Sequence, residues 1–258
     1  MIFIKTDREI ELMRQSNRLL SATLAELVPL IQPGVTTIRL DQVAESYIRD
    51  HGGIPGFKGY NGFPNTLCVS INDQVVHGIP SQRTLKEGDI VSIDCGVYMN
   101  GYHGDSAFTF PVGEVDEDSL KLLRVTRESL YLGIEQAVSG NRLGDIGYAI
   151  QQHCESNGFS VVREMVGHGI GKDLHEAPEV PNYGKKGYGT LLKSGMTIAI
   201  EPMINMGKRH IVQEQDGWTI RTSDHSRSAH FEHSVVIRDD KAEILSDFDV
   251  IDKALSNK

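Results

Sequence analysis

Cysteine and long apolar segments are scarce in this sequence, and each scarcity excludes a class of protein. Only three cysteines occur among 258 residues, and no Cys-x-x-Cys pair is present, which argues against a disulfide framework or a zinc finger. No apolar run approaches the roughly 18 residues of a membrane-spanning helix. The opening MIFIKTDREI is also too short an apolar stretch for a signal peptide. We therefore expect a cytoplasmic protein with no membrane partner.

Positive charge is in deficit as well. The 26 lysines and arginines are outnumbered by 35 aspartates and glutamates, which leaves a formal net charge of −9. This balance argues against binding to a phosphate backbone as the main activity, so no DNA partner is expected. No Pro/Gly/Ser-rich linker, low-complexity tract or block of like charge divides the chain. With 39% hydrophobic residues, a single globular domain over residues 1–258 is the simplest interpretation.

Apolar periodicity predicts helices in two separate parts of the chain. The first helix opens with a capping box formed by Thr6 and Glu9, a pattern typical of helix N-termini. Gly140 and Gly158 follow the last two helices, as is common at C-termini. The predicted helices cover residues of about 6–31, 37–51, 116–139 and 143–157.

Runs rich in Val and Ile predict strands after each pair of helices. Strands are predicted around residues 67–72, 89–99 and 106–112, and again around 160–166, 196–205 and 229–237. The last of them is expected to return as a hairpin through Asp239-Asp240. Because helices and strands occur twice in similar order, we predict an α+β fold of two related halves, although no clear sequence repeat is present.

Two aspartates are predicted on one face of a hairpin. The Asn100-Gly101 dipeptide is a strong two-residue turn signal, and such a turn would pair Asp94 with Ala107 and Asp105 with Gly96. The two carboxylates would then be diagonal neighbours on the same face. They would repel each other unless a cation lay between them. Because strands disfavour Asp and burial of unpaired charge is costly, we interpret the pair as a buried site.

Two glutamates show the same anomaly in the second half. Glu201 lies within MTIAIEPMIN and Glu232 within AHFEHSVVI, both apolar segments with little basic charge. Four acids in four predicted strands call for a counter-charge, and a divalent metal is the natural one.

Two histidines lie in a glycine-rich segment predicted to be a constrained loop. GHGIGKDLHEAP carries His168 between two glycines and His175 seven residues later, unlike the helical HExxH pattern of zinc proteases. One imidazole and four carboxylates suit two ions such as Mn, Fe, Co or Zn. Two such ions can share a water of lowered pKa, which indicates hydrolysis.

The motifs that carry these residues resemble those of the type I methionine aminopeptidases in their short bacterial form. The matching segments are FPNTLCVSINDQVVHGIP, GDIVSIDCGVYMNGYHGDSAFTFPVG, GHGIGKDLHEAP, AIEPM and DGWTIRTSDHSRSAHFEH. The resemblance implies the pita-bread fold, with two pseudo-symmetric halves of antiparallel sheet and covering helices. It also implies removal of N-terminal methionine from newly made proteins, with a preference for small second residues. A monomer that works near the ribosome is expected.

The resemblance assigns roles to residues of this chain. It implies that two divalent metal ions per chain are bound, with Asp105 and Glu232 bridging them. The implied metal ligands are Asp94, Asp105, His168, Glu201 and Glu232. Glu201 would also move protons, and His77 and His175 would contact the scissile amide. The methionine pocket would be formed by Tyr60, Phe63, Cys68 and Trp218. The alternative is that these aromatic residues are ordinary core, which is less natural for Trp218 in the polar stretch QDGWTIRT.

Two positions depart from the pattern of well-known bacterial members. Leu174 stands where Phe is common, and His230 stands where Gln is common. On a continuous strand His230 would share a face with Glu232, so it could touch the site or tune a ligand. His103, on the face of Asp105, is a further candidate for such a role.

Three other functions remain as alternatives. A proline-specific peptidase of the same fold would carry a large domain before its metal ligands, whereas Asp94 comes early here. A non-catalytic pita-bread binding module would lack some of the ligands, and all five are present. A metal-storage role would not need the additional histidines.

Overall fold

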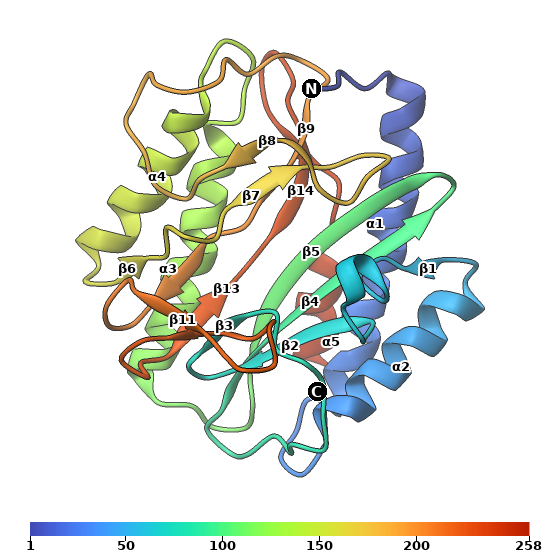
Figure 1. Cartoon of the computed structure of the whole chain (residues 1–258), viewed down its shortest axis with the longest axis vertical. Helices are drawn as coiled ribbons and strands as arrows, with labels where there is room; N and C mark the ends of the chain where they lie inside the picture. Colours follow the sequence, from blue (N-terminus) through green and yellow to red (C-terminus); the bar gives the residue numbers. More distant parts are fainter. Residues whose placement is uncertain (258) are drawn as a thin grey trace.

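The computed structural model describes residues 1–257 and contains helices on both sides of antiparallel sheets (Figure 1). The helices are α1 (Asp7–Leu27), α2 (Thr37–Asp50), α3 (Glu117–Glu135), α4 (Leu143–Ser156) and α5 (Asp249–Ser256). The strands are β1 (Ile54–Pro55), β2 (Leu67–Ile71), β3 (Gln74–Val76), β4 (Ile90–Met99), β5 (Tyr102–Pro111), β6 (Ser160–Val161), β7 (Gly167–Gly169), β8 (Glu176–Val180), β9 (Thr197–Ile200), β10 (Met203–Asn205), β11 (Ile211–Gln213), β12 (Ile220–Thr222), β13 (Ser228–His230), β14 (His233–Val236) and β15 (Glu243–Ile244).

The four predicted helices are present, and two of them are shorter than predicted. The capping box at Thr6 forms, but α1 ends at Leu27 and a 3₁₀ turn over Val28–Leu30 follows. Pro29 is the second residue of this turn and has no N–H for an α-helical bond. The third helix ends at Glu135 rather than near residue 139. The helices predicted over 37–51 and 143–157 agree with α2 and α4 to within a residue.

The hairpin of β4 and β5 has the predicted register. Asp94 pairs with Ala107 and Asp105 with Gly96 across the Asn100-Gly101 turn, so both carboxylates lie on one face. The four-stranded sheet of the first half has the order β1-β4-β2, with β5 paired to β4. The main sheet of the second half has the order β15-β14-β9-β7-β8, and the predicted hairpin into β15 is confirmed.

Each of the two long strands predicted in the second half is broken in the middle. β9 and β10 replace the strand over 196–205 and are separated by Glu201-Pro202, and β13 and β14 replace the strand over 229–237 and are separated by Phe231-Glu232. Proline cannot donate a ladder hydrogen bond. The prediction that both glutamates lie inside strands was therefore wrong, because each of them lies at a break.

Two further predictions about the second half were also wrong. The strand predicted over 160–166 is limited to Ser160–Val161. The histidine segment is not a loop, because His168 is the middle residue of β7 and β7 pairs with β8. The loop between β7 and β8 ends with His175, which directly precedes Glu176, the first residue of β8.

The two halves join where β5 runs beside the β13–β14 segment. The Glu232 backbone N–H donates a hydrogen bond to the Ala107 carbonyl oxygen at 2.9 Å. The Ser234 hydroxyl donates to the Asp105 carbonyl oxygen at 2.8 Å. These contacts place an acid of the first half next to an acid of the second. One apolar cluster also extends from α1 through both sheets to α5.

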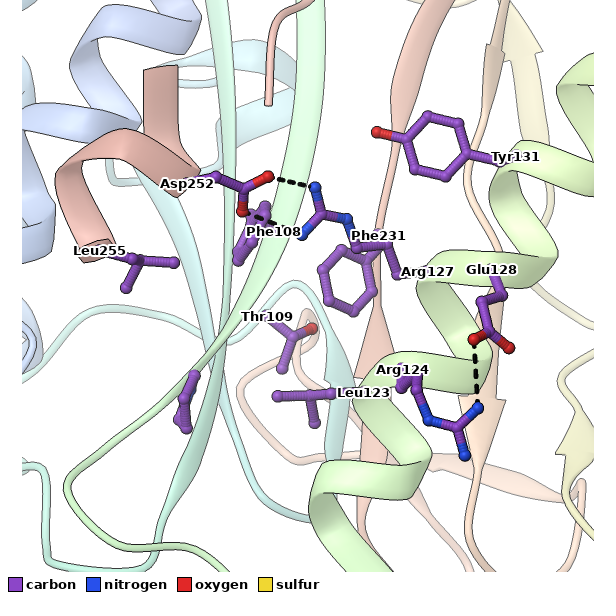
Figure 2. A pocket seen from close by; sticks show the side chains of 11 residues that line it. Phe108, Thr109, Leu123, Arg124, Arg127, Glu128, Tyr131, Phe231, Asp252 and Leu255 are labelled. Atoms are coloured by element: carbon purple, nitrogen blue, oxygen red, sulfur yellow. Dashed lines mark hydrogen bonds and ion pairs between the residues drawn. The ribbon is translucent and has the colours of Figure 1, made fainter. Parts of the chain in front are cut away.

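The short helix α5 is held by contacts that local sequence does not encode, and it was not predicted. Arg127 of α3 donates two hydrogen bonds to the Asp252 carboxylate, at 2.9 and 2.5 Å (Figure 2). An apolar hollow of about 380 Å³ lies beside this ion pair and includes Phe231 in its lining. Of the predicted site residues, none lines this hollow.

Within the part of the chain that is described, no helix combines the length and apolar character needed to cross a bilayer.

Candidate metal centre and active site

All the side chains predicted to act in catalysis, metal binding or substrate binding line one cavity of about 370 Å³. They come from both halves of the chain, and the cavity lies where β5 meets the second half. The predicted residues in its lining are Tyr60, Phe63, Cys68, His77, Asp94, Asp105, His168, His175, Glu201, Trp218 and Glu232.

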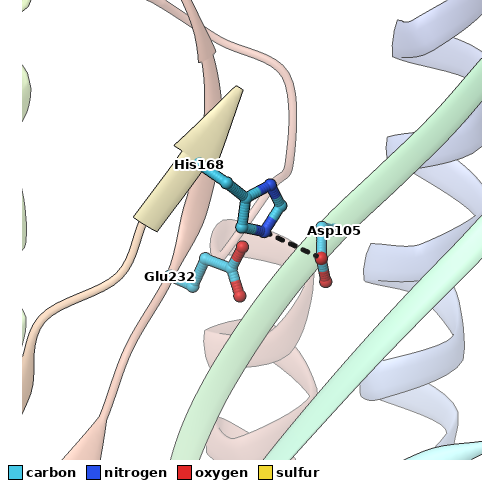
Figure 3. Close-up of side chains that lie close together, drawn as sticks. All are labelled: Asp105, His168 and Glu232. Atoms are coloured by element: carbon cyan, nitrogen blue, oxygen red, sulfur yellow. Dashed lines mark ion pairs between the residues drawn. The ribbon is translucent and has the colours of Figure 1, made fainter. Parts of the chain in front are cut away.

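Three of these side chains converge in a first acidic cluster. Asp105, His168 and Glu232 each offer a ligand atom, and these atoms lie within 4.8 Å of one another. Figure 3 shows the imidazole directed from β7 toward the carboxylates of β5 and of the segment before β14. The Nε2 atom of His168 lies 3.6 Å from Asp105 Oδ2 and 3.7 Å from Glu201 Oε1. Its Nδ1 atom lies 2.9 Å from the Gly169 carbonyl oxygen, so Nδ1 donates and Nε2 faces the acids.

A second cluster shares one residue with the first. Glu201, His230 and Glu232 also place ligand atoms within 4.8 Å of one another. The His230 Nε2 atom lies 3.5 Å from Glu201 Oε2. Asp94 belongs to neither cluster among the described residues, although it lies in the same cavity, where the Asp105 charge adds to the effect of burial and raises the pKa of Asp94.

The carboxylates of the cavity carry an excess of negative charge. Burial first, and then the neighbouring acids, raise the pKa of Asp94 and of Glu232 well above the usual range. Burial also raises the pKa of Asp105, although His168 opposes the shift. Burial lowers the pKa of His168, but Asp105 and Glu201 outweigh that effect and raise it. Throughout residues 1–257, no Lys or Arg forms an ion pair with these acids.

Several carboxylate oxygens of the cavity are buried without a partner, which shows that these acids lack a counter-charge. One carboxylate oxygen of each of Asp94, Asp105 and Glu232 is buried without a hydrogen-bond partner among the described residues. Such atoms cost free energy unless something satisfies them. Carboxylate oxygens with an imidazole nitrogen are a donor set that divalent metals accept. The residues of the cavity therefore fit the predicted metal.

The raised carboxyl pKa values predict how the metal-free protein responds to pH. The folded protein holds protons that the unfolded chain has already released above about pH 4, so these groups lower the free energy of unfolding as pH rises. We expect Asp94→Asn to raise the melting temperature in chelator, with a larger gain at pH 7 than at pH 4. Thermal unfolding of the two proteins measures this gain. A gain that is equal at both pH values, or one matched by the exposed-site variant Asp240→Asn, would contradict the expectation.

His77 is held in place by an unusual backbone. Its φ of 59° is left-handed, which few residues adopt without support. A Cβ atom on the next residue, Gly78, would lie 2.2 Å from the Val69 carbonyl oxygen, so only glycine fits there. Burial lowers the pKa of His77, which keeps the imidazole neutral in neutral solution.

His175 faces the same cavity from the other side. Its Nδ1 atom lies 3.0 Å from the Tyr60 hydroxyl oxygen, and its ring is 4.2 Å from that of His168 between centroids. Desolvation, followed by the His168 charge, lowers the pKa of His175 to about 4. Two neutral imidazoles thus flank the acidic clusters.

An apolar pocket adjoins the clusters. Phe57, Phe63, Cys68 and Leu174 form one buried group, with Tyr60 and Trp218 packed against it. The rings of Phe63 and Trp218 meet edge to face at 5.1 Å. Burial, and then the Asp94 charge, raise the pKa of the Cys68 thiol well above its usual range, so it is a neutral wall of the pocket rather than a nucleophile.

One residue of this pocket was not predicted, and one residue predicted to act near the metal ligands lies outside the cavity. Phe57 lines the cavity and was not predicted, although a signal was present. A Cβ on Gly96 would lie 2.5 Å from the Phe57 ring, so a glycine inside the buried strand β4 marks a close approach. The ring of His103, by contrast, lies 4.7 Å from that of Tyr98 between centroids, with the two planes tilted by 48°, and His103 is not among the residues that line the cavity.

Comparison with known proteins gives consistent results over nearly the whole chain. Residues 11–239 match the model of metallopeptidase family M24. The chain is 52% identical to methionine aminopeptidase 1 of Bacillus subtilis over 95% of its own length and 99% of the relative's. It is 45% identical to methionine aminopeptidase of Escherichia coli, covering 95% of this chain and 94% of that one.

Solved structures agree with the sequence relatives. The crystal structure of methionine aminopeptidase from Rickettsia prowazekii superposes with a TM-score of 0.94 at 42% identity, covering 95% of this chain and all of that one. An Xaa-Pro dipeptidase from Bacillus anthracis has a TM-score of 0.75 at 22% identity, and only 61% of its chain is covered. The latter likeness concerns the fold alone. The predicted α+β pita-bread fold is confirmed.

Proposed function

The chain belongs to metallopeptidase family M24 and removes N-terminal methionine in a metal-dependent reaction, and we propose that it does so with two divalent ions. The proposed ligands are Asp94, Asp105, His168, Glu201 and Glu232, with Asp105 and Glu232 shared. The observation that supports this most strongly is the set of buried carboxylate oxygens that no Lys or Arg neutralises in the described chain. Such ions, when bound, lower the pKa of a water and polarise the scissile carbonyl.

Glu201 is proposed to move the proton. Its two carboxylate oxygens face His168 and His230 at 3.7 and 3.5 Å, which orients the group at the edge of the acidic clusters. From there it accepts a proton from the attacking water and returns it to the leaving amine. The strand break at Glu201-Pro202 supports this role, because the side chain is not confined to the pleat of a sheet.

His77 and His175 are proposed to stabilise the charge that develops on the scissile carbonyl oxygen. Both line the cavity and both have a lowered pKa, so each is neutral and retains one ring N–H. A Tyr60 hydroxyl that donates to His175 Nδ1 leaves the ring proton on Nε2. Donors fixed before the reaction lower the barrier because they need no reorganisation.

The apolar pocket is proposed to bind the methionine side chain. Tyr60, Phe63, Cys68 and Trp218 were predicted for this purpose, and Phe57 and Leu174 pack with them. A thioether gains favourable contacts with aromatic rings. The proposed substrates are newly made protein chains that begin with methionine.

Peptide hydrolysis after metal removal tests this function. The chelated protein should release nothing, and addition of Mn²⁺ or Co²⁺ should restore release of methionine from Met-Ala-Ser but not cleavage of Ala-Pro-Ala. Cleavage of the second peptide alone would indicate a proline peptidase. Cleavage of neither would support a non-catalytic binding protein.

Selectivity for the second residue gives a further prediction. The cavity of about 370 Å³ has to hold both the methionine side chain and the reacting bond, so a large second side chain should collide with its walls. We expect Met-Ala peptides to be cut faster than Met-Leu and Met-Lys peptides, measured as kcat/KM. Equal rates for the three would contradict the prediction.

A further inference from the structure

His230 is a buried histidine that the proposed ligand set leaves unused. Only 1% of its surface is exposed, and neither ring nitrogen has a hydrogen-bond partner within the described residues. Leaving two buried polar atoms unsatisfied is costly, and the cost falls when a partner is supplied. The two buried ring nitrogens of His230 therefore need a partner that the described residues do not supply.

The backbone on both sides of His230 fixes where its ring points. Its N–H donates to Thr109 Oγ1 at 2.9 Å, and the same hydroxyl donates back to its carbonyl oxygen at 2.7 Å. This exchange ties the last residue of β13 to β5 just before the strand breaks. The ring then reaches Glu201, with Nε2 at 3.5 Å from Oε2.

The geometry of the second cluster matches the needs of a metal ion. Metal bonds to imidazole nitrogen and carboxylate oxygen are roughly 2.0–2.2 Å long, so ligand atoms on opposite sides of an ion are about 4 Å apart. The ligand atoms of Glu201, His230 and Glu232 lie within 4.8 Å of one another. The ligand atoms of the first cluster also lie within 4.8 Å of one another, and it too holds two carboxylates and one imidazole, that of His168.

We propose that His230 is a sixth protein ligand, which coordinates the ion held between Glu201 and Glu232. The proposed shared carboxylates remain Asp105 and Glu232, and the His168 imidazole also lies beside Glu201, with Nε2 at 3.7 Å from Oε1. The inference rests on the proposed two-metal function and extends it. Imidazole suits Zn, Cu, Fe and Ni, whereas Mn favours oxygen ligands, and Co²⁺ stands above Mn²⁺ in the general affinity order of such sites. His230 therefore biases one of the two sites toward nitrogen-preferring metals.

Metal titration of a conservative variant tests the inference. His230→Gln keeps a polar side chain but removes the imidazole. In calorimetric titrations of chelated protein, we expect it to weaken one of two Co²⁺ sites by about 10- to 100-fold and to change Mn²⁺ affinity by less than about threefold. The visible spectrum of bound Co²⁺ should also change. His77→Gln is the matched control, because His77 lines the same cavity outside both clusters, and its Co²⁺ affinities and spectrum should equal those of wild type.

The outcomes separate this inference from the proposed function. Wild-type protein that binds fewer than two Co²⁺ ions would overturn the proposed function. Two bound ions with unchanged Co²⁺ affinity and spectrum in His230→Gln would overturn only the role of His230.

A measurement on wild-type protein guards against misfolding of the variant. The proton NMR spectrum of the Co²⁺-loaded protein should contain paramagnetically shifted ring signals from two coordinated histidines, His168 and His230. Signals from a single histidine would overturn the inference.

Discussion

Replacement of Asp105 by alanine is expected to reduce methionine release by about 10³-fold or more. Asp105 is buried, and its carboxylate lies in the first cluster with His168 and Glu232. Because Asp105 is proposed to be shared by two ions, its removal should disturb both of them. A bound metal is worth several kcal/mol of transition-state stabilisation, where each ~1.4 kcal/mol is about a factor of ten. The rate of methionine release from Met-Ala-Ser, measured with excess Mn²⁺ or Co²⁺, checks this expectation.

Stability separates loss of function from loss of fold in this variant. Asp105 adds negative charge to a cavity whose acids already raise one another's pKa. In chelator, Asp105→Ala should therefore lose less stability than truncation of a buried side chain usually costs. The exposed Asp118→Ala variant serves as the control and should keep full activity. Retained activity of Asp105→Ala, with two ions bound, would show that Asp105 has been assigned the wrong role.

Replacement of His77 by alanine should lower kcat by about 10²- to 10³-fold, the usual cost of one preorganised donor, while both ions remain bound. The residue lines the cavity but belongs to neither acidic cluster, so metal content should not change. Steady-state kinetics with a metal assay on the same sample checks both parts. Metal loss, or unchanged turnover, would contradict the assignment.

Backbone strain at this position calls for a second variant. His77 has a left-handed φ of 59°, which Gly adopts without the steric cost that Ala has. His77→Gly has no side-chain donor and should therefore be as slow as His77→Ala. Recovery of turnover in the Gly variant would mean that the alanine effect came from the backbone.

Local signals were sufficient to predict the first half of the site. The Asn100-Gly101 turn determines the register of β4 and β5, and that register places Asp94 and Asp105 on one face. Turn chemistry and the two-residue period of a strand are local properties, so sequence alone contains them. The capping box at Thr6 was predicted for the same reason.

The second half of the site depends on tertiary contacts and was only partly predicted. The predicted residues line the cavity, but the strand breaks at Glu201-Pro202 and Phe231-Glu232 were not predicted. The Glu232 N–H donates to Ala107 of the other half, more than a hundred positions away, and no local pattern encodes that bond. His230 was predicted to lie near Glu232, and it also lies in a cluster with Glu201, a contact between distant segments that no local pattern encodes.

Anomalous scattering from crystals grown with Mn²⁺ tests most directly whether two ions bind at the acidic clusters. We predict two peaks in the cavity that share Asp105 and Glu232, with the His168 Nε2 atom beside one of them. A single peak, or peaks away from these carboxylates, would contradict the proposed two-metal centre.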